Sequence, residues 1–318
     1  MPTYIDNSIL DAVSSCSSEA VLRYVLGLTT RKEAAHLQAG SWGHKAMETW
    51  FRGGTKAEAM TVFTDGYRPW IEQAFADGEK VEDRLSYENC AAILEFWFDS
   101  HDVTRFPWVV EPDLVEIGFS APLDDAGEYV LVGRIDLVGT DKRTGDSYIV
   151  DHKFPGKVSW YWSRQFRMSS ALSGYQWAVQ NHLDIGKQVV GSYINAIELS
   201  KLPSDPVRKC PKHATAYREC GPLHAQAEIL GPFTRTPQQL EEWRKTALGL
   251  AKRYESLCDT YPTLKQLDRV RMEGMFNGSC RFCQFYDFCT VGRPREYVDS
   301  YLEESRWEPY KHAFGGGE

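Results

Sequence analysis

The chain has 318 residues, of which 42% are hydrophobic and 25% are charged, values that are ordinary for a folded protein with a substantial core. The formal net charge of −8 argues weakly against a nucleic-acid partner, although nucleic-acid sites depend on local charge. Without an apolar run of the roughly 18 residues that a membrane helix needs, and without a signal-peptide layout at the N-terminus, we expect a cytoplasmic protein that has no membrane contact.

Hydrophobic periodicity changes along the chain from helical to strand-like and back. In chain order it predicts helices over 7–26, 41–51, 56–79 and 86–99, strands over 108–112, 114–123, 129–139 and 147–154, a helix over 167–182, strands over 188–199 and 223–230, and a helix over 236–259. This order predicts an α+β fold with a mixed, mostly antiparallel central sheet flanked by helices. We expect one domain, 1–318, with an N-terminal helical part (1–105), a core (106–235) and a C-terminal helix and cysteine segment (236–318).

Charged residues interrupt two of the apolar strands. Asp136 lies in VLVGRIDLVG, and SYIVDHKF carries Asp151, His152 and Lys153 in a row. Residues i and i+2 of a strand face the same side, so Asp151 and Lys153 share a face. If the two strands form a hairpin centred between Thr140 and Ser147, Asp136 lies directly opposite Asp151, with their Cβ atoms roughly 4.5–5.5 Å apart.

Two carboxylates that close repel each other unless a cation or a shared proton lies between them. A few oxygen ligands with open positions suit Mg²⁺ or Mn²⁺ acting on a phosphate. A plain buried ion pair between Lys153 and one of the aspartates is the alternative. The same register also sets Arg134 opposite Lys153, which is unfavourable, so a register shifted by two is a second alternative.

A wider ordered set of residues resembles the PD-(D/E)XK nuclease superfamily, and its RecB-like branch in particular. The set is Gly40 and His44 in AGSWGHKAMETW, then Gly133–Asp136, then Asp151 and Lys153, then an aromatic helix. The resemblance implies a restriction-endonuclease-like core in which His44, Asp136, Asp151 and the backbone carbonyl of His152 bind the metal ion. It further implies that Lys153 supports the nucleophile and that Glu116, in the preceding strand, is a catalytic acidic residue. Glu48 lies one helical turn after His44, where we expect it to orient the imidazole.

The chain departs from this resemblance on the helix after the lysine. RecB-like enzymes carry a Q-x-x-x-Y motif there; Tyr175 matches the tyrosine, but Ala171 stands at the glutamine position, with Gln165 or Gln176 as possible substitutes. The segment before this helix combines Lys157, Arg164 and Arg167 with several aromatic residues, a composition that suits a nucleic-acid strand. We therefore expect Lys157, Arg164, Arg167 and Tyr175 to contact DNA; a solvated loop is the alternative for the segment.

Clustered cysteines in a chain without a secretion signal favour a metal site over disulfides. Cys280, Cys283 and Cys289 have the spacing C-x2-C-x5-C, and a fourth ligand has to come from elsewhere in the chain. In RecB-like nucleases with a [4Fe–4S] cluster, such as the AddB subunit and CRISPR adaptation nucleases, one cysteine precedes the nuclease core and three follow it. By this resemblance Cys16 is the fourth ligand of a structural cluster, with zinc as the alternative metal. A second zinc site at Cys210, Cys220, His213 and His224 is a further hypothesis.

Together these features predict a metal-dependent DNA nuclease, most simply an exonuclease acting on DNA ends or single strands in repair, recombination or phage DNA processing. Its partners would be DNA and possibly a helicase, recombinase or integrase. The alternative is a non-catalytic DNA-end-binding or assembly subunit with the same fold. A DNA glycosylase with a C-terminal iron–sulfur loop fits the cysteine trio, but fits neither the position of the fourth cysteine nor the strand-rich centre.

Overall fold

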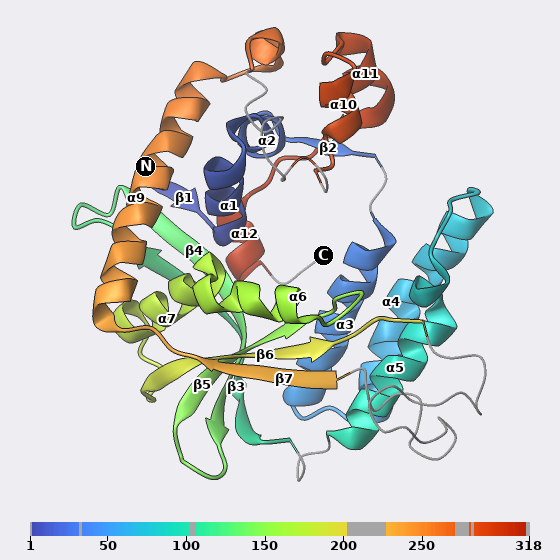
Figure 1. The fold of residues 1–318 in the computed structure, drawn as a ribbon, viewed down its shortest axis with the longest axis vertical. Helices are drawn as coiled ribbons and strands as arrows, with labels where there is room; N and C mark the ends of the chain where they lie inside the picture. The colour runs from blue at the N-terminus through green and yellow to red at the C-terminus, as the bar shows by residue number, and fades with distance from the viewer. Residues whose placement is uncertain are drawn as a thin grey trace.

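The computed structural model describes residues 2–31, 34–101, 106–201, 227–270, 280 and 283–315. Among these residues, a six-stranded sheet lies between two groups of helices (Figure 1). Its strands are β1 (Thr3–Ile5), β3 (Trp108–Pro122), β4 (Tyr129–Asp141), β5 (Ser147–Lys153), β6 (Val189–Ile197) and β7 (Ala227–Phe233). The order is β1-β4-β5-β6-β7, with β3 also beside β4. β1 and β5 run parallel to β4 and β6 respectively, and the other pairs are antiparallel, so the predicted mixed sheet is confirmed.

Apolar side chains from both faces of the sheet form two cores. One core joins the sheet to α1 (Asn7–Ser15), α7 (Ser170–His182) and α9 (Pro237–Thr260). The other joins it to α3 (Ala35–Phe51), α4 (Lys56–Ala76) and α5 (Tyr87–Ser100). Within β5, Ile149 belongs to the first core and its neighbours Tyr148 and Val150 to the second. This burial on both faces explains the continuous apolar run that precedes Asp151.

The two ends of the chain meet in a third, smaller core. It is formed mainly by the π-helical turn η1 (Val21–Val25), β2 (Leu28–Thr30), η4 (Leu264–Arg269), α10 (Tyr286–Thr290), α11 (Arg295–Tyr301) and β8 (Leu302–Glu304). β2 and β8 pair as a two-stranded antiparallel sheet, which Figure 1 shows away from the central sheet. After this sheet, α12 (Pro309–Phe314) returns to pack its Ala313 against β4.

The helix predicted over 7–26 is wrong as a single element. It breaks at Cys16, whose φ of −158° and ψ of 107° are extended, and continues as α2 (Ser17–Ala20) and η1. The hydroxyls of Ser14 and Ser15 donate to the carbonyl of Asp11, the kind of side-chain competition that favours helix ends. The break places Cys16 at a junction rather than on a helix face.

The remaining predicted elements agree with the structure apart from their ends. α3 begins earlier than predicted, at Ala35, and the short 3-10 helices η2 (Asp83–Leu85) and η3 (Gln165–Met168) precede α5 and α7. The two strands predicted over 108–112 and 114–123 form one strand, β3, whose register shifts between Val110 and Val115. The start of the strand predicted over 223–230 lies outside the described residues. No described helix is both long and apolar enough to cross a membrane.

Candidate active site

The site begins where β4 and β5 separate. Their ladder runs from Thr140 paired with Ser147 to Leu137 paired with Val150, which is the predicted hairpin register. It ends one pair before Asp136 and Asp151. β3 pairs along one edge of β4, while β1 and β5 take the two ends of its other edge. The segment of β4 that ends in Asp136 therefore lies in a fork between β1 and β5.

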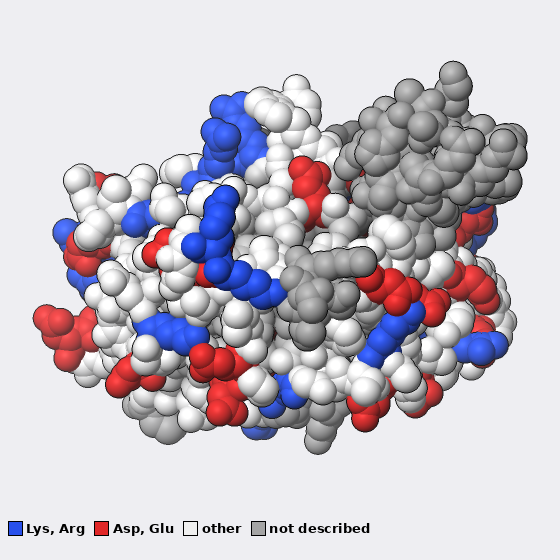
Figure 2. All heavy atoms as spheres, turned by 90° about the horizontal axis from the view of Figure 1, so that it is seen from below, with Lys and Arg blue, Asp and Glu red and all other residues white. Residues whose placement is uncertain are grey.

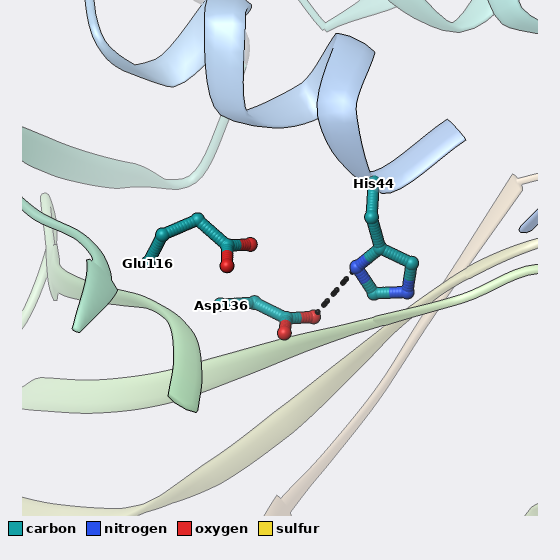
Figure 3. A group of neighbouring side chains, drawn as sticks. All are labelled: His44, Glu116 and Asp136. Atoms are coloured by element: carbon teal, nitrogen blue, oxygen red, sulfur yellow. Dashed lines mark ion pairs between the residues drawn. The ribbon is translucent and has the colours of Figure 1, made fainter. Parts of the chain in front are cut away.

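Helix α3 brings His44 over this fork. Its Nδ1 lies 3.3 Å from Oδ2 of Asp136, and Figure 3 shows the imidazole pointing from the helix toward the strand. The helix approaches closely because of a glycine: a Cβ on Gly43 would lie 2.6 Å from the ring of Phe154, just beyond β5. Burial, together with the nearby Lys153 ammonium, lowers the pKa of His44 to about 4, so the ring is neutral and able to bind a metal at neutral pH.

Strand β3 contributes Glu116 in a left-handed backbone conformation. Its φ is 53°, which is uncommon for a residue other than glycine. It lies between the pairs Val115–Leu137 and Ile117–Ile135, so it stands across from Asp136. Burial, followed by the charges of Asp136 and Glu48, raises the pKa of the Glu116 carboxyl to about 8.

His44, Glu116 and Asp136 form a group whose ligand atoms all lie within 4.8 Å of one another (Figure 3). Burial also raises the pKa of Asp136, despite the opposing effect of Lys153. Two carboxylates held this close repel each other when both are ionised, and a divalent cation would relieve that repulsion while the neutral imidazole offers it a nitrogen ligand. The donor set therefore fits Mg²⁺ or Mn²⁺.

Asp151 and Lys153 form an ion pair beside this group. Nζ of Lys153 lies 2.6 Å from Oδ2 of Asp151, and the lysine side chain is 42% exposed against 5% for the aspartate. Burial lowers the pKa of Lys153, but Asp151 and Asp136 outweigh it and raise the pKa, so the ammonium is charged. The ion pair considered as an alternative is thus present, and it lies at the edge of the candidate metal site rather than away from it.

His152 contributes its backbone to the site and its side chain to the core. Its N–H donates to Oδ2 of Asp136 at 2.6 Å, closing the fork in place of a ladder hydrogen bond. Its ring points away from Asp151 and stacks on Phe51 of α3, with centroids 5.4 Å apart. The side chain is therefore packed in the core, as the strand alternation predicts.

Two expectations about neighbouring side chains are wrong. Glu48 pairs with Arg52 at 3.1 Å, while the His44 nitrogen faces Asp136. Arg134 does not oppose Lys153, because its guanidinium turns toward α12, donating to the carbonyls of His312, Ala313 and Gly315. There its Nη1 lies 3.7 Å from Oε2 of Glu116, a neighbour that the hairpin register alone did not suggest.

The residues expected to contact DNA fall into two groups. Lys157, Arg164 and Arg167 are exposed, and the guanidinium of Arg164 lies 4.9 Å from the ring centroid of Trp160 in α6 (Trp160–Arg164). Tyr175 instead packs edge-on against Phe119, and burial, followed by the charges of Asp151 and Asp136, raises its pKa well above the usual value. Tyr175 is thus a partly buried neighbour of the carboxylates, and its contact with DNA stays a prediction.

The two candidate replacements for the glutamine missing at Ala171 differ in their surroundings. Gln176 is buried, and its amide donates to the Ser192 hydroxyl and to the carbonyl of Phe233, so it joins α7 to β6 and β7. Gln165 is exposed in η3. The substitution of Gln176 for the motif glutamine is therefore wrong.

The cysteines singled out in the sequence come together at the other end of the molecule. Cys16, Cys280, Cys283 and Cys289 line one cavity of about 220 Å³ together with Leu22, Phe285 and other residues. Burial, with smaller contributions from the charges of Glu19, Cys289 and Cys16, raises the pKa of Cys283 to about 12 despite a hydrogen bond with the Phe285 backbone. Thiols gathered in this way suit a thiophilic metal. When such a metal binds, the thiols lose their protons, and the metal charge offsets the repulsion between the resulting thiolates. Cys210, Cys220, His213 and His224 lie outside the described residues.

A family model described as the PD-(D/E)XK nuclease superfamily matches residues 7–290. The chain belongs to the PD-(D/E)XK nuclease superfamily. Membership makes it a metal-dependent nuclease with DNA as substrate, and His44, Glu116 and Asp136 form a candidate metal site. The match includes both the fork and the cysteine cavity. Among curated proteins, no sequence matches the chain.

The sequence did not indicate two residues that contact the candidate site residues from distant parts of the chain. Asn195, a buried amide on β6, bonds the His152 ring; the only signal was a lone amide in the otherwise apolar run SYINAI. Arg134 was noted for its register, but nothing in the sequence placed the C-terminal helix α12 beside it.

Proposed function

We propose that this nuclease is a RecB-like exonuclease that shortens DNA from an end or along a single strand. The observation that carries the proposal is the position of the His44, Glu116 and Asp136 group next to the Asp151–Lys153 pair. This arrangement combines a candidate cation site with one partly exposed ammonium. It is what phosphodiester hydrolysis requires.

In this proposal the metal ligands are the side chains of His44, Asp136 and Asp151 and the backbone carbonyl of His152, with Glu116 as a further acidic ligand. When bound, Mg²⁺ or Mn²⁺ supplies Lewis acidity that lowers the pKa of a water and neutralises charge on the phosphate. Lys153 holds the attacking water in line through its ammonium and stabilises negative charge that develops on the phosphate oxygens. Glu116, whose proton is retained to about pH 8 without a metal, loses that proton when it binds the cation.

The DNA strand would cross the surface formed by Lys157, Arg164 and Arg167. Trp160 and Tyr161 of α6 are 63% and 82% exposed, and exposed aromatic rings flanked by cations suit base stacking and phosphate contact. Figure 2 shows Lys and Arg side chains interspersed with Asp and Glu over the face seen from below. The described part of that face therefore carries no large positively charged patch that would attract DNA. A local stacking platform explains how a chain with net charge −8 holds its substrate.

A Trp160→Ala variant tests this path. We expect it to weaken binding of single-stranded DNA by the roughly 1–3 kcal/mol that one base-stacking residue contributes, measured by fluorescence anisotropy with a 5′-labelled oligonucleotide in Ca²⁺. Tyr310→Ala, an exposed aromatic on α12, is the matched control and should bind as wild type. Equal weakening in both variants, or in neither, would contradict the path.

For the cysteine cavity we propose a [4Fe–4S] cluster bound by Cys16, Cys280, Cys283 and Cys289, with zinc as the alternative metal. Three of these thiols come from one short segment and the fourth from the helix break near the N-terminus, so the metal would join the chain ends. The role is structural, because the site lies on the third core rather than in the fork.

A non-catalytic DNA-end-binding subunit is the second candidate function. One observation favours it: Ala171 removes the glutamine that RecB-like enzymes use, and Gln176 faces the core instead. The partner of such a subunit would be a helicase, recombinase or integrase. In this second reading the protein binds DNA ends as part of a larger assembly.

A nuclease assay on end-labelled single-stranded and duplex DNA with Mn²⁺ distinguishes the two functions. We expect wild-type protein, purified anaerobically, to shorten DNA from one end and Lys153→Ala to lose on the order of 10²–10³-fold in rate. The position of the label gives the polarity. Binding of DNA without cleavage in either Mg²⁺ or Mn²⁺ would support the non-catalytic subunit.

A further inference from the structure

The backbone of His152 contacts two of the metal-site residues. Its N–H donates to Oδ2 of Asp136 at 2.6 Å, and its carbonyl accepts a hydrogen bond from the His44 ring. The described pairing of β4 and β5 ends before this point, at Leu137 and Val150. The backbone conformation of one residue therefore sets the relative positions of an imidazole and a carboxylate that have to meet one cation.

The side chain of His152 lies on the face of the strand opposite to Asp151, where its ring centroid is 6.1 Å from that of His44. The residue is 2% exposed, and its ring lies parallel to that of Phe51, with an interplanar angle of 9°. Its Nδ1 lies 2.9 Å from Nδ2 of Asn195, which is itself fully buried. Asn195 is the direct register partner of His152 on β6, so the contact follows from the parallel pairing of the two strands.

The direction of this hydrogen bond follows from a third residue. The indole Nε1–H of Trp97, on α5, can only donate, and it lies 3.3 Å from Oδ1 of Asn195. The amide oxygen therefore faces Trp97, and the amide nitrogen faces His152 and donates to it. Nδ1 of His152 is then an acceptor without a proton, and the proton of the neutral ring lies on Nε2.

We propose that Asn195 is a positioning residue of the nuclease site, which holds the His152 ring as its Nε2–H tautomer and thereby fixes the backbone of His152, whose N–H and carbonyl contact Asp136 and His44. Trp97 sets the direction of the Asn195 amide. The proposal rests on the proposed function in one respect, that a divalent cation binds at His44, Glu116 and Asp136. It adds a chain of contacts from the helical layer of α5, through β6, to that site.

The test compares Asn195→Ala and Asn195→Asp with the matched control Gln176→Ala. Gln176 is also a buried amide bonded to β6, but it projects from α7, and its amide donates to the Ser192 hydroxyl and the Phe233 carbonyl rather than to His152. Each protein is titrated with Mn²⁺ by electron paramagnetic resonance, and its melting temperature is recorded. The ring nitrogens of ¹⁵N-histidine-labelled protein are assigned by NMR in the wild type and in Asn195→Asp.

We expect Asn195→Ala to bind Mn²⁺ about 10–100-fold more weakly, the cost typical of losing an outer partner of a metal ligand. Gln176→Ala should lose melting temperature but retain wild-type Mn²⁺ affinity. In Asn195→Asp the carboxylate accepts from both Trp97 and His152, so the proton should move to Nδ1, and Mn²⁺ affinity should fall as well.

Wild-type Mn²⁺ affinity in Asn195→Ala, or a proton on Nδ1 of His152 in the wild type, would overturn the proposal while leaving the proposed function in place. An equal loss of affinity in Gln176→Ala would also overturn it, by showing that general loosening of β6 suffices. A wild-type protein that binds no Mn²⁺ would overturn both this proposal and the proposed function.

Discussion

The fork at the end of β4 and β5 and the cysteine cavity are assembled in opposite ways. In the fork, side chains from two strands and one long helix are held by a hairpin register, a close helix approach at Gly43 and a backbone hydrogen bond from His152. In the cavity, thiols more than 260 residues apart in the sequence meet on a small core built from short elements. The first site is formed by the fold, whereas the second is proposed to need its metal in order to form.

The largest effect that would sharpen this contrast is expected from Cys16→Ser. In the proposed cluster Cys16 is a ligand, and its loss would remove a link that closes the chain over more than 260 residues; links of that span contribute on the order of 4 kcal/mol to the free energy of unfolding. We expect the variant to lose its iron and most of its brown colour and to melt at a much lower temperature. Iron analysis and calorimetry under anaerobic conditions measure both.

Cys258→Ser is the control, because Cys258 is a thiol of α9 that does not line the cavity. It should retain iron and melt close to wild type. A Cys16→Ser protein that keeps both its iron and its melting temperature would place the fourth ligand elsewhere and remove the contrast between the two regions.

A smaller effect on stability is expected in the fork from Gly43→Ala. The added methyl group would lie 2.6 Å from the Phe154 ring, and overpacking of this kind costs about 1–3 kcal/mol. Since the same helix carries His44, Mn²⁺ affinity should also fall. Calorimetry and a Mn²⁺ titration measure the two effects.

Gly249→Ala is the matched control, because a Cβ at that position in α9 meets no other atom within 4 Å. There the change should stabilise the helix by roughly 0.5–1 kcal/mol. If both alanine variants stabilise the protein, then α3 does not approach β5 as closely as the fork requires.

The last of these effects concerns pH. In the folded, metal-free protein the pKa of Glu116 is raised to about 8, so between its ordinary value of 4.5 and pH 8 the folded state binds more protons than the unfolded state does. The Glu116 contribution to stability is therefore present below pH 4.5 and is lost as the pH rises toward 8. For the same reason Mn²⁺ affinity should increase by up to about tenfold per pH unit below pH 8.

Arg134→Ala extends this prediction, because Arg134 lowers the pKa of Glu116. Its removal should shift the pH profile of Mn²⁺ binding to higher pH, with weaker binding at pH 7. Lys187→Ala, which removes a cation that pairs with Glu111 on the same strand, should leave the profile unchanged. An unchanged profile in Arg134→Ala would show that Glu116 is not a ligand.

The sequence predicted the fork better than it predicted the surroundings of the fork, for a physical reason. Asp136, Asp151 and Lys153 are set by a short hairpin, and strand alternation with a tight turn fixes a register that can be read locally. The positive φ of Glu116, the turn of Arg134 toward α12 and the contact between Asn195 and His152 depend on segments far away in the chain. Local periodicity carries no information about those approaches.

Helix 7–26 shows the same limit at the other site. Its apolar spacing is helical throughout, but the serines around Cys16 offer the backbone other hydrogen-bond partners, and the chain turns there. The expected pairing of Glu48 with His44 failed because Arg52 lies one turn further along the same helix and attracts the carboxylate. In both cases a helical spacing in the sequence was outweighed by a second local feature of the same sequence, the serines around Cys16 in one case and Arg52 in the other.

The most direct test of the central claim is a Mn²⁺ titration, followed by electron paramagnetic resonance, of the wild type, Asp136→Asn and Cys16→Ser. If the fork gathers a divalent cation independently of the cysteine cavity, the wild type and the folded fraction of Cys16→Ser will bind Mn²⁺, and Asp136→Asn will bind it far more weakly. Mn²⁺ binding by Asp136→Asn at wild-type strength would contradict the account.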